Sequence, residues 1–198
     1  MTKPKKDIRK LNLREIEEYL NSVGEKSFRA KQIYEWLWKK NAHKFEDMTN
    51  LSKDLRSELD QVFSIDNIRV DLMQKSDDGT IKNAVKLHDG NTVESVLIPT
   101  PTRTTACVSS QVGCSLNCTF CATATLKRMR NLTAAEIVDQ VVVIDKQSRD
   151  YFNRPLSNIV YMGMGEPMMN YNEVVKSIQI ITSPDGLGMS PRRITVST

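Results

Sequence analysis

From Arg103 onward, short apolar stretches typical of strands alternate with longer amphipathic stretches typical of helices. Strands are expected at residues 104–108, 158–162 and 194–197, and helices at residues 134–148 and 171–181. Thr133 and Glu136 form a capping-box pattern where the first of these helices begins. Repeated strand–helix units predict a parallel sheet or barrel with right-handed crossovers. In such folds, ligands bind at the C-terminal ends of the strands.

The first hundred residues follow a different pattern. Apolar residues at helical spacing indicate three helices. The first has Asn12 as its N-cap, the second contains Ile33 and the third contains Leu55. Alternating apolar residues then predict short antiparallel strands, with turns at Asp78-Gly79 and Asp89-Gly90. We therefore expect a helical module at residues 1–62, a β segment or linker at 63–101 and the first part of a barrel core at 102–198.

The cysteines and the charge limit the classes of protein that fit. The chain of 198 residues contains no apolar run long enough to cross a bilayer, and its MTKPKK start has none behind it, so a cytoplasmic address is expected. All four cysteines lie between Cys107 and Cys121. Without an export signal, this clustering indicates metal or thiol chemistry rather than a disulfide framework.

The net charge of +4 includes two basic clusters that could neutralise RNA phosphates. Their members are Lys3, Lys5, Lys6, Arg9 and Lys10, and Lys127, Arg128 and Arg130. Solvated surface charge explains the same clusters, and from charge alone it is the preferred interpretation.

The spacing Cys114-x3-Cys118-x2-Cys121 places three thiols in one short loop after a predicted strand. Three thiolates can bind three of the four irons of a cubane iron-sulfur cluster, which leaves the fourth iron open to a substrate. Catalytic zinc sites likewise keep one coordination position open. The alternative is structural zinc with Cys107 as the fourth ligand. Structural zinc sites usually pair ligands from two separated knuckles, so the cluster is preferred.

A second loop, at residues 162–167, follows the next predicted strand and contains Gly163, Gly165 and Glu166. Glycine allows close approach of the backbone to a ligand, and a carboxylate can accept hydrogen bonds from an ammonium group. A glycine-rich turn with one acid is common. Together with the cysteine loop one strand–helix unit earlier, it resembles the site that binds the amino group of S-adenosylmethionine (SAM) in radical SAM enzymes.

The stretch TACVSSQVGCSLNCTFCAT at residues 105–123 resembles the cluster loop of the RlmN family of radical SAM RNA adenine methyltransferases and of its relative Cfr. Further resemblances cover residues 28–37, 48–53, 162–167 and 192–198, so they span almost the whole chain. The resemblance implies an α/β fold: a partial (βα) radical SAM barrel, truncated, preceded by a small helical module and a short antiparallel β segment.

The resemblance also implies a reaction: methylation of adenine C2 in large-subunit rRNA and in tRNA, with a [4Fe-4S] cluster and SAM as cofactors. Because C2 has no nucleophilic lone pair, the family route first methylates a protein cysteine. A deoxyadenosyl radical takes hydrogen from the S-methyl group, and the resulting methylene radical adds to the base. A general base of the protein then removes the C2 proton of the adenine. A second thiol forms a disulfide with the first cysteine, and this step resolves the protein–RNA crosslink.

The resemblance also implies roles for individual residues of this sequence. The resemblance implies Cys114, Cys118 and Cys121 as cluster ligands, and Gly165, Glu166 and Ser197 as SAM contacts. It further implies Glu94 as the proton acceptor, with a pKa raised by burial beside the cluster, and Cys107 as the resolving thiol. Without the resemblance, Glu94 is a solvent-facing strand residue and Cys107 a small buried hydrophobe. An electron donor such as flavodoxin, no membrane and a monomeric full-length protein are also expected.

Two departures from the family pattern matter. Residues 124–130 are ATLKRMR where the family commonly has glycines, so a stiffer and more basic loop is expected. The sequence ends at Thr198 inside a predicted strand, so the methyl-carrying cysteine and the remaining SAM contacts are expected beyond it, and this chain alone is expected to be inactive. A Cfr-type adenine C8 methyltransferase and a non-catalytic, zinc-stabilised RNA-binding module remain the alternatives.

Overall fold

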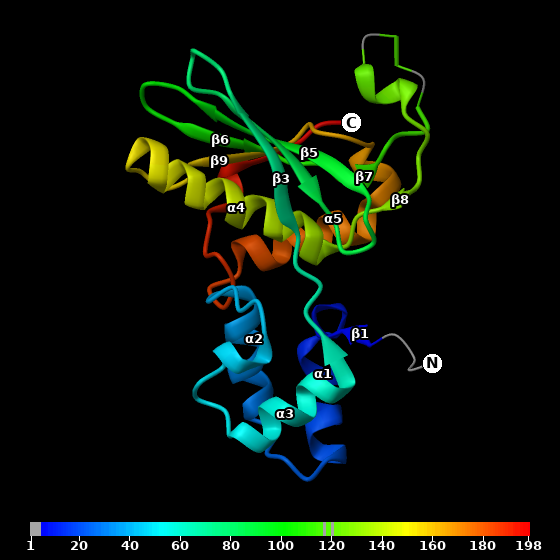
Figure 1. Cartoon of the computed structure of the whole chain (residues 1–198), viewed down its shortest axis with the longest axis vertical. Helices are drawn as coiled ribbons and strands as arrows, with labels where there is room; N and C mark the ends of the chain where they lie inside the picture. Colours follow the sequence, from blue (N-terminus) through cyan, green and yellow to red (C-terminus); the bar gives the residue numbers. More distant parts are fainter. Residues whose placement is uncertain (1–4, 117, 120) are drawn as a thin grey trace. The chain divides into compact units, whose positions relative to one another are not determined.

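The computed structural model describes residues 5–116, 118–119 and 121–198, which form two compact units. One unit contains the described residues up to Asp66 together with Ser183–Gly188. The other contains Asn67–Thr182 and Met189–Thr198 (Figure 1). No helix within the described residues is both long enough and apolar enough to span a membrane.

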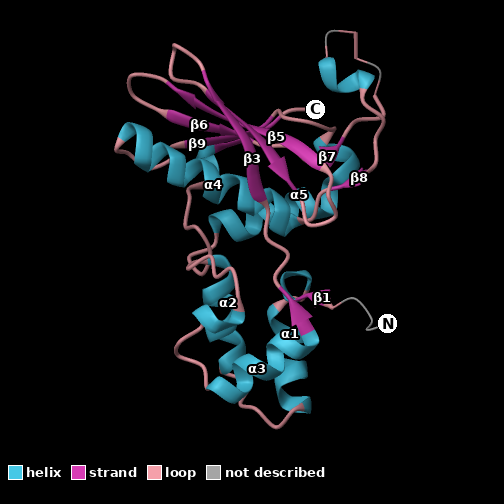
Figure 2. Cartoon of the chain, in the orientation of Figure 1, coloured by secondary structure: helices cyan, strands magenta, loops and turns pink. Residues whose placement is uncertain are grey.

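The first unit is mainly helical, as Figure 2 shows. Its elements are β1 (Lys6–Asp7), η1 (Ile8–Lys10), α1 (Leu13–Ser22), α2 (Arg29–Trp38), η2 (Phe45–Asp47), α3 (Lys53–Val62) and β2 (Phe63–Ser64). The three predicted helices are confirmed. Asn12 and Glu15 complete a capping box at α1, and Ser52 caps α3. Apolar side chains at helical spacing, among them Ile16 and Leu59, are fully buried in the core of this unit.

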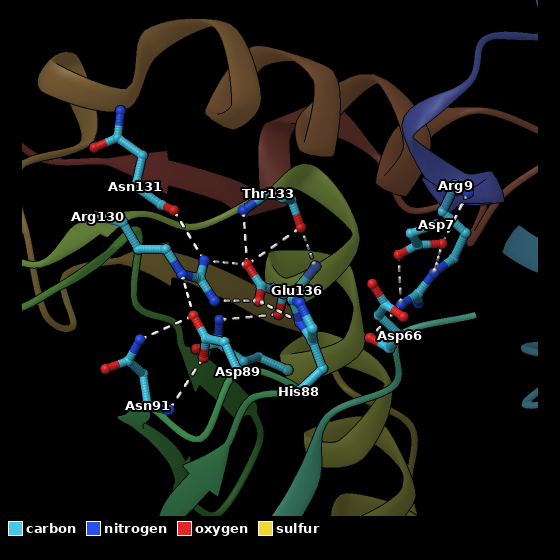
Figure 3. Close-up of polar contacts among 11 residues, drawn as sticks. Asp7, Arg9, Asp66, His88, Asp89, Asn91, Arg130, Asn131, Thr133 and Glu136 are labelled. Carbon is cyan, nitrogen blue, oxygen red and sulfur yellow. Dashed lines mark hydrogen bonds and ion pairs between the residues drawn. The ribbon is translucent and has the colours of Figure 1, made fainter. Parts of the chain in front are cut away.

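A buried ion pair changes the interpretation of the N-terminal basic cluster. Arg9 is 4% exposed, and its guanidinium lies 3.4 Å from the Asp7 carboxylate and donates to the Asp66 carbonyl at 2.7 Å (Figure 3). A buried, paired guanidinium cannot reach a phosphate. The inclusion of Arg9 among phosphate-binding residues was therefore wrong, and Lys3 lies outside the described residues.

The second unit is built on a six-stranded sheet with the order β10-β9-β6-β5-β4-β3. Its strands are β3 (Arg69–Lys75), β4 (Ile81–Lys86), β5 (Thr92–Pro99), β6 (Thr104–Cys107), β9 (Asn158–Tyr161) and β10 (Ile194–Val196). The strands β6, β9 and β10 are parallel, whereas β3, β4, β5 and β6 pair antiparallel in sequence order. The β segment expected at residues 63–101 thus shares a sheet with the strand–helix repeats.

Two helices, α4 (Ala134–Phe152) and α5 (Tyr171–Thr182), follow β6 and β9 and lie on one face of the sheet (Figure 2). The capping box of Thr133 and Glu136 is confirmed at the start of α4. This helix continues past the predicted end to Phe152, because Asn153 provides the left-handed residue that terminates it, at φ 51°. The short helices η4 (Pro167–Asn170) and η5 (Pro191–Arg193) precede α5 and β10.

A separate two-stranded ladder carries the cysteine loop. Strand β7 (Gln111–Val112) pairs antiparallel with β8 (Arg130–Asn131), and we call this ladder the neck. Between these strands in the sequence lies η3 (Ala122–Thr125), which Figure 1 shows away from the sheet. Cys114, Cys118 and Cys121 therefore lie on the segment between the two strands of the neck, whereas Cys107 lies on β6.

Candidate active site

The chain segments after β6 and β9 lie against each other, as expected for parallel neighbours. The amides of Ser110 and Gln111 both donate to the carbonyl of Met164, at 2.9 and 3.1 Å. In return, the Met164 amide donates to the Ser109 hydroxyl at 2.8 Å. The approach to the cysteine loop and the loop at residues 162–167 are thus joined by hydrogen bonds at the C-terminal ends of β6 and β9.

The glycines of the second loop are explained by this contact. A Cβ at Gly163 would lie 2.8 Å from the Ser109 amide nitrogen, and a Cβ at Gly165 would lie 2.4 Å from the Gln111 Cβ. Gly165 also has a φ of +95°, which side-chain-bearing residues rarely adopt. The sequence predicted close approach to a ligand, and the structure shows that both glycines also allow close approach of a neighbouring chain segment.

Glu166 lies at the end of the same loop and is half-buried. Its carboxylate accepts from the Met168 amide at 2.9 Å, which caps η4, and its own amide donates to the Gln111 side chain at 2.9 Å. Ser197 directly follows β10 and is exposed. Because β10 pairs with β9 in parallel, Glu166 and Ser197 both follow neighbouring strands at the same edge of the sheet.

The three cysteines of the loop differ in exposure: Cys118 is exposed, whereas Cys114 and Cys121 are half-buried. The Leu116 amide donates to the Cys114 sulfur at 3.4 Å. A backbone hydrogen bond from Thr123 lowers the pKa of the Cys121 thiol. Among the described residues, no three His, Cys, Asp or Glu side chains gather closely enough to hold one metal ion.

Cys107 stands apart from the loop, in the middle of the sheet. It lies on β6, opposite Val96 of β5 and Val160 of β9. Burial raises the pKa of its thiol, and a backbone hydrogen bond from Met162 opposes part of that shift. The thiol is therefore mainly protonated near neutral pH, and in this form it is a weak nucleophile.

The burial expected for Glu94 was wrong. This residue points to the solvent-accessible side of β5, its side chain is 49% exposed, and its carboxylate forms an ion pair with Lys82 on β4 at 2.6 Å. Ala84 is the residue directly opposite on β4, so the side chain that reaches the carboxylate from that strand is that of Lys82. Glu94 is therefore accessible from solvent.

Comparison with known proteins shows which family this chain resembles. A family profile described as "Ribosomal RNA large subunit methyltransferase N-terminal domain" matches residues 6–65, and one described as "Radical SAM superfamily" matches residues 108–198. A "Probable dual-specificity RNA methyltransferase RlmN" from Christiangramia forsetii is 68% identical over 194 residues, which are 98% of this chain and 55% of that protein. A "Dual-specificity RNA methyltransferase RlmN" from Geotalea uraniireducens is 50% identical with the same coverage of both chains.

This chain belongs to the RlmN family. The structure described as "Crystal Structure of a radical SAM methyltransferase from Sphaerobacter thermophilus" matches 98% of the chain at a TM-score of 0.85 and 41% identity, and 57% of that structure is covered. The predicted α/β fold, with a partial radical SAM barrel after a helical module, is therefore confirmed. The chain spans about half the length of the curated relatives it matches.

The residues of the RlmN-family cysteine loop fit an iron-sulfur cluster by their chemistry. Residues 109–131 contain three thiols and no histidine, aspartate or glutamate, so they offer only soft sulfur ligands. Backbone hydrogen bonds already reach the sulfurs of Cys114 and Cys121, and such bonds stabilise thiolate ligands. The exposed side chains of Lys127 and Arg128 add positive charge that would offset the charge of a thiolate cluster.

The neck takes part in a charged contact that sequence reasoning missed. Arg130 on β8 donates to both carboxylate oxygens of Glu136 on α4, at 2.8 and 2.7 Å, and to Asp89 of the β4–β5 turn at 2.6 Å (Figure 3). The Thr133 amide also donates to Glu136, at 2.9 Å, and His88 lies 3.7 Å from it. One guanidinium thereby fastens the cysteine-loop neck to a helix and to a turn of the sheet.

Burial would raise the pKa of Glu136 and Asp89, but the hydrogen bonds and charge of Arg130 outweigh it and hold both pKa values below their ordinary range. The same contacts raise the pKa of Arg130. All three groups are therefore charged at neutral pH. The capping box identified Glu136 in the sequence, but nothing local indicated that Arg130 and Asp89 would join it.

Proposed function

We propose that this chain supplies the cluster-binding and SAM-binding part of a radical SAM methyltransferase that methylates C2 of adenine in large-subunit rRNA and in tRNA through a methyl-cysteine. The observation that carries this proposal is the cysteine loop itself: three thiols, with no competing metal-binding side chain, on a neck that is hydrogen-bonded to the Glu166 loop. The family membership given above supports the substrate class.

In this proposal, Cys114, Cys118 and Cys121 hold the cluster, and Gly165, Glu166 and Ser197 contact SAM. When bound, the cluster supplies the electron that cleaves SAM and so starts the radical reaction. The protein's part is to hold the cluster and the SAM amino group in a fixed relation. The hydrogen bonds between the chain segments after β6 and β9 support that role, because they join the approach to the cysteine loop to the loop that contains Glu166.

Cys107 is proposed as the resolving thiol and Glu94 as the proton acceptor. A carboxylate with accessible oxygens can take the C2 proton once its ion pair with Lys82 opens. Cys107 is a neighbour of Glu94 in the sheet, since it lies opposite Val96 on β5. With three cysteines assigned to the cluster and Cys107 to resolution, the methyl-carrying cysteine would belong to the length of the relatives that this chain does not span.

Metal identity is tested by anaerobic reconstitution of the full-length gene product with iron and sulfide. We expect a brown protein, with the cluster lost in C114A, C118A and C121A and retained in C107A. The alternative zinc module, with four cysteine ligands, predicts a colourless protein that keeps zinc and loses it in C107A as well. That result would rule out the proposed chemistry.

The reaction is tested by mass mapping of the methylated adenine after incubation with rRNA and tRNA, SAM and a reduced flavodoxin. Methylation at C2 is expected, whereas methylation at C8 would assign the Cfr-type activity instead. Glu94→Gln and Cys107→Ala should each accumulate a covalent protein–RNA species on a denaturing gel, because each blocks resolution after the radical addition. Absence of this species in both variants would remove the two roles.

A further inference from the structure

Gln111 is a fully buried residue that connects the two loops of the candidate site. It lies on β7, the entering strand of the neck, and is 0% exposed. Its side-chain oxygen accepts the Glu166 amide at 2.9 Å, and its side-chain nitrogen donates to the Asn131 side chain at 2.8 Å. One amide group therefore bonds to the Glu166 loop on one side and to the returning strand of the neck on the other.

The fit around Gln111 is close. Its backbone amide donates to the Met164 carbonyl at 3.1 Å, and its Cβ and Cγ pack where a Cβ of Gly165 would lie. Gly165 therefore makes room for Gln111. The Glu166 loop cannot shift along the neck without breaking these bonds or colliding with this side chain.

Asn131, on β8, extends the same connection. Its side-chain oxygen also accepts from Arg128 at 2.9 Å, and its side-chain nitrogen donates to the Met169 carbonyl at 3.2 Å. The entering strand of the neck is thus bonded to Glu166, and the returning strand to Met169 just beyond it. Both strands that carry the cysteine loop are tied to one short segment.

We propose that Gln111 is a positioning residue that sets the cysteine loop at a fixed distance from Glu166. This inference rests on the proposed function, in which the loop holds the cluster and Glu166 contacts the SAM amino group. SAM would then be held from two separate loops at once, so its affinity depends on how well their separation is fixed. Gln111 is the side chain that spans that separation.

Gln147 provides a matched control for a merely structural role. It is also a buried glutamine of this unit, and its side-chain amide exchanges two hydrogen bonds with Asn83, at 2.9 and 2.7 Å. Those partners lie on α4 and β4, not on either loop of the site. Replacing either glutamine by methionine conserves volume and removes a buried, hydrogen-bonded amide.

The experiment compares the full-length gene product with its Gln111→Met, Gln111→Asn and Gln147→Met variants after anaerobic reconstitution. The measured quantities are iron and sulfide per chain, the dissociation constant for SAM, and the change that SAM causes in the electron paramagnetic resonance spectrum of the reduced cluster. Amide hydrogen exchange of residues 112–130 and 163–169 is measured on the metal-free protein. Gln111→Asn keeps the polar group but is one methylene too short to reach both partners, so it serves if Gln111→Met does not fold.

We expect both Gln111 variants to take up the cluster, to bind SAM about tenfold more weakly, to show an altered SAM-dependent spectrum and to exchange faster in both segments together. Gln147→Met should lose thermal stability without these changes. An unchanged SAM affinity and spectrum in a folded Gln111 variant, or equal losses in Gln147→Met, would overturn the inference alone. Failure of the unsubstituted protein to bind a cluster or SAM would overturn the proposed function, and the inference with it.

Discussion

Arg130 and Glu136 form a two-pronged ion pair in which each terminal guanidinium nitrogen meets a different carboxylate oxygen, at 2.8 and 2.7 Å. The Glu136 side chain is 3% exposed and that of Arg130 is 28% exposed. Paired charges in such a position contribute orientation as well as energy, because both groups are planar. The pair fixes where the cysteine-loop neck meets α4.

Removal of Arg130 should strongly destabilise the sheet-containing unit. Arg130→Met leaves the buried Glu136 carboxylate without its counter-charge, which costs about 3 kcal/mol of unfolding free energy. Arg149→Ala is the control, because Arg149 pairs with Asp145 on the exposed side of the same helix and should cost under about 0.5 kcal/mol. Urea denaturation of both variants measures the difference. Equal costs would show that the Arg130 pair is no more than a surface contact.

The same charges should make stability depend on acid pH. Because the folded pKa values of Glu136 and Asp89 are lowered, the unfolded chain takes up protons first as the pH falls below about 4. The stabilisation is fully present above that range and is lost as the pH falls through the folded pKa values. The cost of Arg130→Met should therefore shrink between about pH 7 and about pH 3. A cost that stays constant across this range would contradict the assigned charge states.

Alanine substitutions at two glycines should separate backbone strain from steric collision. Gly90 and Gly165 both have positive φ, at 85° and 95°, but only a Cβ at Gly165 meets other atoms, those of Gln111. Gly90→Ala should cost about 1 kcal/mol from strain alone. Gly165→Ala should cost about 1–3 kcal/mol more, because it also overpacks the contact between the loops. Thermal unfolding of the two variants measures the gap, and similar losses would mean that the Gln111 contact yields easily.

The four thiols should react at different rates in the metal-free chain. Cys118 is exposed and the pKa of Cys121 is lowered, whereas burial raises the pKa of Cys107. Because the thiolate is the reactive form, Cys118 and Cys121 should be alkylated by iodoacetamide well before Cys107 at about pH 8. Peptide mass mapping over time gives the order, and labelling in urea should abolish it. Rapid labelling of Cys107 in the folded chain would place its thiol outside the sheet.

Much of the fold follows from local patterns. Helical spacing and caps such as Asn12 and Thr133 place the helices, because one turn of backbone and one apolar face decide whether a helix forms. The end of α4 was set too early, since a left-handed Asn153 is only one of several ways to stop a helix. The sequence also placed the cysteine loop and the Glu166 loop after neighbouring parallel strands, and the pairing of β6 with β9 confirms it.

The candidate site was only partly predictable. The resemblance suggested a buried Glu94, but burial depends on what lies over a strand, and in this structure the carboxylate is half-exposed beside Lys82. The glycines at 163 and 165 were interpreted as ligand contacts, and the sequence did not predict that they would also pack against Ser109 and Gln111. Each of these outcomes depends on a partner far away in the sequence.

The sequence by itself determined which reactive groups the loop carries: three thiols at fixed spacing, a fourth cysteine nearby and a strand–helix pattern that places them after a strand. Only the tertiary structure decided how that loop is held. Gln111 meets Glu166, and Arg130 meets Asp89 and Glu136, across separations that no local pattern records. The physical reason is that each residue type fixes the chemical group it carries. The position and charge state of that group arise from contacts that exist only once the chain has folded.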